Sequence, residues 1–272
     1  MGDVIFALQD VYFSYLGRYP VLSGATMDIK RGEKITVMGA NGTGKSTLLM
    51  MLDGLFFPDR GSVAAFGKAL TEAAFNDPAF SRDFRSRVGL VFQNPDVQLF
   101  CPTVREDILF GPLQLGVAAD QAQRRLDELV RLLDIRHLVD RPVHQLSVGE
   151  KRKVAIASTL AVEPEVIILD EPTAGLDPLT CRHIVDFIIE ANAQGKTIIT
   201  ATHDLHIVCE ISDAVYLLTK DKKVTRYGNP DDLLADRKAL QENNLIHIHR
   251  HRHQGSEHAH PHYHFDHHHE EA

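Results

Sequence analysis

Short, largely apolar runs separated by segments of helical spacing recur along most of the chain. Such runs are typical of strands buried on both faces of a sheet. They stand at residues 34–38, 88–92, 166–169, 197–201 and 214–218. Hydrophobic residues at helical spacing follow the first run, at 48–55, and separate the third run from the fourth, at 179–193. We therefore predict an α/β fold with a parallel sheet that helices cover on both faces.

Three stretches depart from this alternation. Residues 4–15 and 21–29 alternate apolar and polar positions in short bursts, which predicts a small antiparallel β layer. Residues 71–86 have no clean period and predict an insertion or a loop with a helix. About 94–160 should form a helical subdomain, with helices near 103–109, 120–134 and 149–161. In the second helix we expect one apolar face, made of Leu126, Leu129, Leu132 and Leu133.

Composition limits the classes of function. A balance of 44% hydrophobic and 24% charged residues is that of a soluble globular protein. The formal net charge of −8 argues against nucleic acid as the main partner, because that binding needs an excess of Lys and Arg. The three cysteines are widely spaced, so we expect a reducing compartment. No leader and no spanning segment is evident, so other chains would cross the membrane in any membrane process.

A glycine-rich segment after the first strand matches the P-loop pattern and opens a helix, as that pattern requires. Its glycines let backbone N–H groups approach phosphate, and the helix N-terminus adds partial positive charge. We expect Lys45 to reach the terminal phosphates, Ser46 to bind Mg²⁺ and Thr47 to contact phosphate. The predicted nucleotide-binding residues of this segment are Gly39, Ala40, Asn41, Gly42, Thr43, Gly44, Lys45, Ser46 and Thr47.

Polar side chains at the ends of later strands complete a predicted hydrolytic site. Asp170 and Glu171 end a buried strand, where two carboxylates are costly unless they have a function. Asp170 should orient Mg²⁺ and Glu171 should act as the general base. His203 and Gln93 each follow a strand, and we expect His203 to contact the γ-phosphate and Gln93 to bind Mg²⁺ or position water. Tyr15 is the candidate for stacking on adenine, although a core role is the usual one for an aromatic residue in a strand.

Residues 146–157, Leu-Ser-Val-Gly-Glu-Lys-Arg-Lys-Val-Ala-Ile-Ala, resemble the signature segment of ABC-type ATPases. The resemblance implies that residues 1–245 form one ABC domain with a P-loop NTPase fold. Its parts would be a mixed, mainly parallel core sheet, a small antiparallel β subdomain and the helical signature subdomain. Two copies would sit head to tail, with the signature of one closing over ATP on the other. The nucleotide-binding residues implied in this way are Ser147, Gly149, Glu150 and Asp177.

The signature departs from the common family form at Val148, usually Gly, and at Glu150, usually Gln. Since Ser147 and Gly149 are retained, we expect two copies still to bind ATP between them, as an ATP sandwich. The extra negative charge of Glu150 should alter the hydrolysis step.

Residues 91–100 (Val-Phe-Gln-Asn-Pro-Asp-Val-Gln-Leu-Phe), with 103–104 and 107–112, are similar to the ATPases of energy-coupling-factor importers. These importers handle cobalt, nickel and vitamins. The resemblance implies transmembrane coupling and substrate-binding subunits as partners, contacted by the segment after Gln93. It also implies a peripheral location on the cytoplasmic face of the cell membrane.

Residues 246–272 are predicted to be a flexible, histidine-rich tail, since 11 of the 16 histidines fall between His247 and His269. Imidazole favours Ni²⁺, Cu²⁺, Zn²⁺ and Co²⁺, so the tail is a candidate transition-metal binder. A purification tag or a solvated low-complexity end is the alternative. The candidate ligands are His247, His249, His251, His253, His258, His260, His262 and His264.

Together these features predict an ATP-hydrolysing, Mg²⁺-dependent subunit that energises import of nickel or cobalt, with Glu171, His203, Lys45 and Gln93 as its catalytic residues. An importer for another small substrate such as a vitamin, a soluble ABC-type ATPase and a non-enzymatic metal store are the alternatives.

Overall fold

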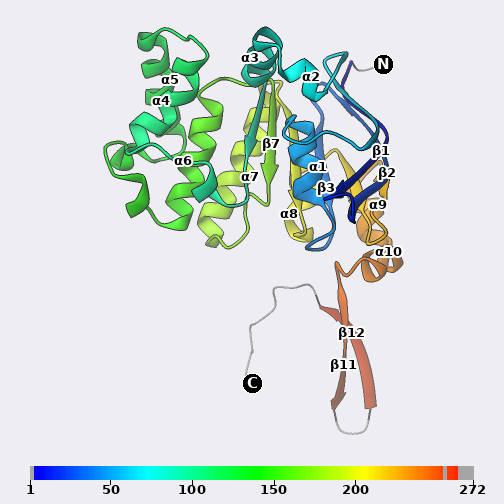
Figure 1. The fold of residues 1–272 in the computed structure, drawn as a ribbon. Helices are drawn as coiled ribbons and strands as arrows, with labels where there is room; N and C mark the ends of the chain where they lie inside the picture. The colour runs from blue at the N-terminus through cyan, green and yellow to red at the C-terminus, as the bar shows by residue number, and fades with distance from the viewer. Residues whose placement is uncertain (1–2, 254–255, 263–272) are drawn as a thin grey trace.

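A six-stranded sheet forms the centre of the computed structural model, which describes residues 3–253 and 256–262 (Figure 1). The strand order is β10-β9-β3-β8-β7-β6, and all neighbours are parallel except β9 and β10. The strands are β3 Lys34–Met38, β6 Val88–Val91, β7 Val166–Asp170, β8 Thr197–Thr202, β9 Ala214–Leu218 and β10 Val224–Tyr227. The predicted α/β class and its parallel strands are therefore confirmed.

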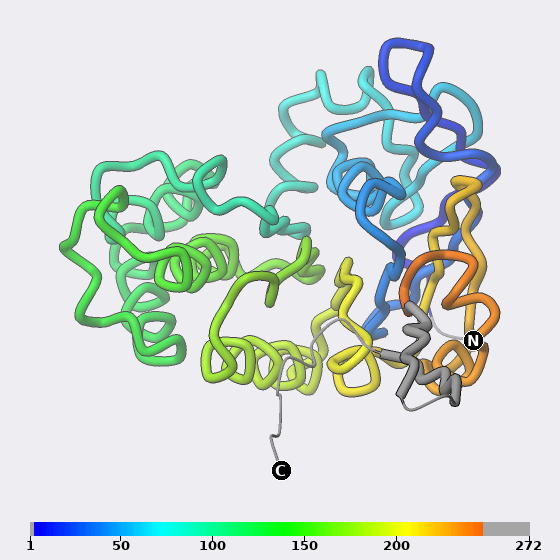
Figure 2. Tube along the Cα trace, turned by 90° about the horizontal axis from the view of Figure 1, so that it is seen from below, coloured from blue at the N-terminus to red at the C-terminus, as the bar shows by residue number. Residues whose placement is uncertain are grey.

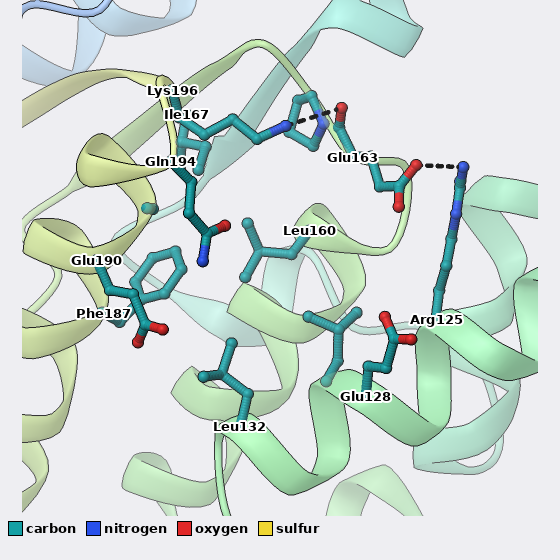
Figure 3. Close-up of a pocket in the computed structure, with 13 residues that line it drawn as sticks. Arg125, Glu128, Leu132, Leu160, Glu163, Ile167, Phe187, Glu190, Gln194 and Lys196 are labelled. Carbon is teal, nitrogen blue, oxygen red and sulfur yellow. Dashed lines mark hydrogen bonds and ion pairs between the residues drawn. The ribbon is translucent and has the colours of Figure 1, made fainter.

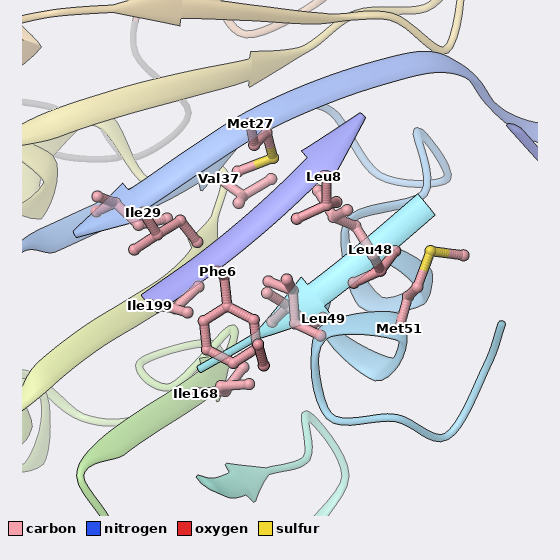
Figure 4. Packing of buried hydrophobic residues seen from close by; sticks show 14 of the residues in the cluster. Phe6, Leu8, Met27, Ile29, Val37, Leu48, Leu49, Met51, Ile168 and Ile199 are labelled. Carbon is pink, nitrogen blue, oxygen red and sulfur yellow. The ribbon is translucent and has the colours of Figure 1, made fainter. Parts of the chain in front are cut away.

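A second, antiparallel sheet has the order β2-β1-β4-β5. Its strands are β1 Val4–Tyr15, β2 Tyr19–Lys30, β4 Arg60–Ala65 and β5 Lys68–Ala69. Helix α1, Lys45–Leu52, lies between this sheet and the central one. Figure 4 shows Leu48 and Leu49 of α1 among residues of both sheets, including Phe6 and Ile168. The antiparallel layer thus buries one face of the P-loop helix.

Alternate residues of the central strands supply two different cores. Ile168 of β7 belongs to the core around α1, whereas Ile167 and Leu169 belong to the core on the other face. This split follows from the two-residue period of a strand. The second core is covered by α4 Val104–Gln114, α5 Ala119–Leu132, α6 Val148–Leu160 and α7 Pro178–Ala193.

Helices α4, α5 and α6 form a lobe beside the sheet (Figure 2). Short 3₁₀ turns connect its parts: η1 Pro95–Val97, η2 Arg136–Leu138 and η3 Val143–Gln145. One expectation for α5 is wrong, because Leu132 is 51% exposed while Leu126 and Leu133 are buried. At about 100° per residue, Leu132 lies well away from the line of Leu126 and Leu133 on the helix surface.

Five helices of the described chain form in segments where the sequence shows no clear hydrophobic period. The segment 71–86 holds two helices, α2 Glu72–Phe75 and α3 Pro78–Arg87. Three more follow β8: α8 Leu205–Ile211, α9 Pro230–Ala235 and α10 Arg237–Glu242. Leu245 and Ile246 are buried against these last helices, so the packed part of the chain includes Ile246.

The chain then continues into two antiparallel strands, β11 His247–His253 and β12 Ser256–His262. The backbone register places His249 opposite His260 and His251 opposite His258. His264 lies outside the described residues. In the described part of the chain, no helix is long and apolar enough to cross a membrane.

Candidate active site

The carboxyl ends of β3, β6, β7 and β8 meet at one edge of the central sheet, because these strands are parallel neighbours. The loops that follow them carry the residues predicted to bind and hydrolyse a nucleotide. A cavity of about 480 Å³ lies there. It is lined by Tyr15, Val21, Asn41, Gly42, Gly44, Lys45, Ser46, Thr47, Gln93 and Glu171.

The P-loop has a backbone shape that few residues other than glycine adopt. Gly42 and Gly44 have φ of 77° and 114°, in the left-handed region. A Cβ on Gly44 would also stand 2.5 Å from Val21 Cγ1. Gly44 is the N-cap of α1, where no side chain caps the helix, and the first turn contains no acidic residue. The N-terminal amides of α1 therefore remain available to an anion.

Lys45 and Glu171 form a buried ion pair at the floor of this cavity. Their side chains are only 6% and 4% exposed, and Lys45 Nζ lies 3.1 Å from Glu171 Oε1. Lys45 Nζ also donates to the carbonyl oxygen of Gly39 at 2.7 Å. Glu171 has a φ of 46°, so its backbone is strained in the left-handed region. The P-loop and the segment after β7 therefore place a cation and a carboxylate in contact.

Thr202, the last residue of β8, and His203, which follows it, hold the carboxylate of Glu171 from the other side. His203 Nδ1 lies 2.9 Å from Glu171 Oε1, and Thr202 Oγ1 donates to Glu171 Oε2 at 3.2 Å. His203 was predicted to contact phosphate, and its contact here is with the carboxylate. The sequence pattern does not distinguish Thr202, although it stands directly before His203 in the chain.

These contacts determine the protonation of the cluster. Burial raises the pKa of Glu171, but the hydrogen bond from His203 and the charge of Lys45 outweigh it, so the pKa lies below its ordinary value. The hydrogen bond to Glu171 raises the pKa of His203, against an opposing effect of burial. Glu171 is therefore ionised at neutral pH, which is the state that a general base requires.

Asp170 fits the predicted role of holding Mg²⁺. Its side chain is buried, and within the described residues its Oδ1 has no hydrogen-bond partner. A buried carboxylate oxygen without a partner is costly, and a hard cation with its bound water would satisfy it. Burial raises the pKa of Asp170, while a hydrogen bond from Ser46 lowers it. Ser46 and Asp170 thus present two oxygen ligands beside the cavity.

Tyr15 and Gln93 both line the cavity, from β1 and from the segment after β6. The hydroxyl of Tyr15 lies 3.0 Å from Thr47 Oγ1, and its ring meets Phe13 and Phe56 edge to face. Tyr15 is nevertheless 39% exposed, which leaves part of it accessible to a ligand. Its stacking on adenine stays a prediction. Gln93 is exposed, and its contact with Mg²⁺ or water also stays a prediction.

The signature residues lie around a different cavity, of about 380 Å³, and not around the P-loop. Ser147, Gly149, Glu150 and Asp177 all line it. Ser147 and Glu150 form a reciprocal capping box at the start of α6, in which Ser147 N donates to Glu150 Oε2 at 2.7 Å. This hydrogen bond and the nearby Arg141 hold the pKa of Glu150 below its ordinary value. Asp177 caps α7 by accepting from Thr180 N.

A larger cavity, of about 590 Å³, opens where β7 begins, between α5, α6 and α7 (Figure 3). Leu160, Phe187 and Ile167 give it an apolar floor, with Glu128 and Glu190 at its rim. It lies at the opposite end of β7 from Asp170 and contains no residue of the P-loop. A triphosphate therefore fits the P-loop cavity of about 480 Å³ better than this larger one.

Replacing His203 by Gln should make the stability of the nucleotide-free protein less dependent on pH. The pKa of His203 is raised on folding, so its contribution is complete below the ordinary value of 6.5 and is lost as the pH rises through the raised value. We expect the loss on substitution to be larger near about pH 5.5 than near about pH 9, and to stay below about 1 kcal/mol because solvent screens this partly exposed side chain.

Urea unfolding at the two pH values measures this difference. His183→Gln, at an exposed position on α7, is the matched control. Equal losses at both pH values would contradict the pairing with Glu171.

Comparison with known proteins agrees with this geometry. The ABC transporter family model matches residues 22–174. The chain is 44% identical over 244 residues to the nickel import ATP-binding protein NikO of Rhodobacter capsulatus, covering 89% of this chain and 95% of that protein. It is 40% identical over 241 residues to the energy-coupling factor transporter ATP-binding protein EcfA of Methanocaldococcus jannaschii, covering 89% and 85%.

A solved structure extends the similarity to the fold. The structure of cbiO1 from Clostridium perfringens, part of the ABC transporter complex cbiONQ, matches with a TM-score of 0.75 and 37% identity, covering 89% of this chain and 95% of that one. The predicted family and fold class are thus confirmed. The chain belongs to the ABC transporter family, as an ATP-binding subunit whose ATPase activity is coupled to transport.

Proposed function

We propose that this ATPase energises the import of nickel or cobalt ions, as one of two copies that hold ATP between them on the cytoplasmic face of a membrane. Transmembrane coupling and substrate-binding subunits are its further partners. The observation that carries the catalytic part is the buried cluster of Lys45, Glu171 and His203 beside the uncapped start of α1. The nickel or cobalt cargo rests on the histidine-rich segment after Ile246.

In this proposal the phosphates of ATP lie against the N-terminal amides of α1 and take over Lys45 from Glu171. Glu171 then accepts a proton from the attacking water, while His203 and Thr202 keep its carboxylate oriented through the contacts described above. Mg²⁺ bound by Ser46 and Asp170 would neutralise charge that develops on the phosphates. Gln93, at the mouth of the cavity, positions the water.

The separation of the two cavities supports a paired arrangement. In one copy the signature residues line their own cavity, which leaves the P-loop of that copy without them. A second copy placed head to tail supplies Ser147, Gly149, Glu150 and Asp177 to the ATP. The carboxylate of Glu150 accepts a hydrogen bond from Ser147 N and pairs with Arg141. It therefore repels an approaching phosphate less than an unpaired carboxylate would.

An exposed apolar patch supports contact with membrane subunits. It consists of Val97, Phe100, Phe110 and Leu113, which are 65%, 66%, 41% and 46% exposed. Phe100 and Phe110 meet edge to face with ring centroids 4.8 Å apart. Apolar side chains gathered at the surface are typical of a binding site for another protein. Val97 and Phe100 follow Gln93 by four and seven positions, so closure around ATP would reach the partner through this segment.

The histidines after Ile246 and one relative indicate the cargo. Among the residues whose side chains the structure describes, no group of three or more His, Cys, Asp or Glu is placed to hold a metal ion. The histidines after Ile246 are therefore the candidates for nickel or cobalt, and similarity to a nickel import ATPase supports that cargo. Similarity to EcfA leaves another small substrate, such as a vitamin, as the second candidate.

Uptake of radioactive nickel and cobalt by cells that express the complete set of subunits tests the proposal. We expect uptake to require this chain and to stop when Glu171→Gln replaces the normal chain, because transport needs hydrolysis. Equal uptake in cells without the chain would end the importer proposal. ATP-dependent uptake of a vitamin, with none of either metal, would establish the second candidate.

A chain that ends at Ile246 tests the tail, since Ile246 is buried and should be kept. We expect this chain to hydrolyse ATP within about twofold of normal and to lose most of its Ni²⁺ binding in calorimetric titration, because its imidazole ligands are gone. Replacing Arg250 and Arg252 by Gln is the control, since it alters charge and keeps every histidine. Undiminished Ni²⁺ affinity in the shortened chain would exclude the tail from metal capture.

A further inference from the structure

The turn between β9 and β10 places a second lysine against the P-loop. This turn, residues 219–223, is closed by backbone hydrogen bonds from Thr219 N to Lys223 O at 2.9 Å and from Lys222 N to Thr219 O at 3.0 Å. At its tip, Lys222 has a φ of 64°, in the left-handed region. A lysine in this region is strained, because its Cβ approaches its own backbone, whereas glycine would not be. Contacts made by the Lys222 side chain could offset the energetic cost of this backbone conformation.

Lys222 joins three parts of the molecule that are distant in sequence. Its Nζ donates to the carbonyl oxygen of Gly42 at 3.0 Å and lies 3.4 Å from that of Thr43. Its own carbonyl oxygen accepts from Ser23 N at 2.8 Å. The residue thus fastens the P-loop to β2 and to the β9–β10 turn. Half-buried, it keeps its ammonium group next to the loop without lining the cavity.

The contact acts on the peptide groups that would hold phosphate. In a trans peptide the C=O and the following N–H point in opposite directions. A cation that draws the carbonyl oxygens of Gly42 and Thr43 toward the turn therefore keeps the amide of Gly44 directed away from the turn. Gly42 and Gly44 are conformationally free, so without an external hold this part of the loop would sample many shapes.

We propose that Lys222 is a positioning residue that holds the P-loop in its phosphate-binding shape from behind. This inference rests on the proposed placement of ATP at the P-loop. Lys45 acts from inside the cavity as a direct phosphate ligand, whereas Lys222 acts through the backbone of Gly42 and Thr43. Its loss therefore weakens ATP binding by making the loop mobile, and it leaves the groups around Glu171 unchanged.

Substitution at position 222 separates this role from a purely structural one. Lys222→Gly removes the side chain and also relieves the left-handed backbone, so the variant should fold with an unchanged or higher melting temperature. We expect its Kd and KM for ATP to rise about three- to tenfold, as for one lost hydrogen bond of ordinary strength, because Lys222 acts on phosphate only through the backbone, with kcat within about twofold. Lys222→Arg, which keeps a cationic donor, should restore most of the affinity.

The matched control is Lys223→Met, because Lys223 is exposed and its only hydrogen bonds that the structure describes are through its backbone. It should bind ATP normally. An unchanged Kd in Lys222→Gly, or the same rise in Lys223→Met, would overturn the inference, as would a fall in kcat that follows a lower melting temperature. Lys45→Met distinguishes the underlying proposal: if it too binds ATP normally, the nucleotide does not sit on the P-loop at all.

Discussion

Replacing Glu171 by Gln should slow ATP hydrolysis by a factor of about 10² to 10⁴, the range for loss of a general base, while ATP still binds. Glutamine has nearly the same size, so the buried position stays filled, and its amide can still meet His203 and Thr202. It cannot accept a proton from water. Since the contacts to phosphate lie elsewhere in the cavity, the Kd for ATP should change little.

The measurement is steady-state phosphate release, together with the size of the protein in ATP and Mg²⁺. If two copies close over ATP, the variant should accumulate as a dimer, because hydrolysis no longer opens it. Glu163→Gln is the control, since Glu163 is 58% exposed and pairs with Arg125 far from the P-loop. Turnover near the normal rate in Glu171→Gln would remove Glu171 from its assigned role. A monomer that binds ATP but never dimerises would refute the sandwich.

The parts of the site that sequence predicted are those carried by short segments with fixed spacing. The P-loop, Glu171 and His203 each follow a strand and Asp170 ends one, and parallel strands bring such positions to one edge whatever the details of the loops. Gln93 follows β6 and lines the P-loop cavity for the same reason, whereas Tyr15 reaches it from β1 of the antiparallel sheet, to which this reason does not apply. Their contacts with a nucleotide stay predictions.

Contacts between distant residues were not predictable in the same way. Lys222 and Gly42 are separated by 180 positions, and nothing in the local sequence distinguishes Lys222 from the lysines beside it. Arg152, buried in α6, donates to the carbonyl oxygen of Phe92 at 2.7 Å and so ties the signature helix to the segment before Gln93. It stood inside the recognised signature, yet only the fold shows what its charge contacts.

Elements of the fold were missed where the apolar pattern is short. Helices α9 and α10 are six residues each, too short for a helical period to stand out, and they became evident through their packing with Leu245 and Ile246. The error at Leu132 has a different source. Periodicity ranks the faces of a helix, but it does not show where the buried face ends, and Leu132 falls on the rim of a cavity.

Replacing Lys45 by Met should have two effects that a double substitution separates. The first is weaker ATP binding, by at least about tenfold, because the terminal phosphates lose a charged ligand. The second is a less stable nucleotide-free protein, because the buried Glu171 loses its cation. Breaking a buried pair costs roughly 3–5 kcal/mol, and His203 and Thr202 still hold the carboxylate, so we expect about 1–3 kcal/mol.

Adding Glu171→Gln to Lys45→Met should restore most of the stability, since a neutral amide no longer needs the cation, but it should not restore ATP affinity. Urea unfolding gives the stability and titration with ATP gives the affinity. Lys34→Met is the control, because Lys34 pairs with Asp213, which is 52% exposed, and such pairs contribute little. If the double variant were as unstable as Lys45→Met alone, Lys45 would stabilise the fold through the Gly39 carbonyl and not through Glu171. Taking Lys45 away from Glu171 would then have no energetic consequence, and ATP would not need to compete with the carboxylate for it.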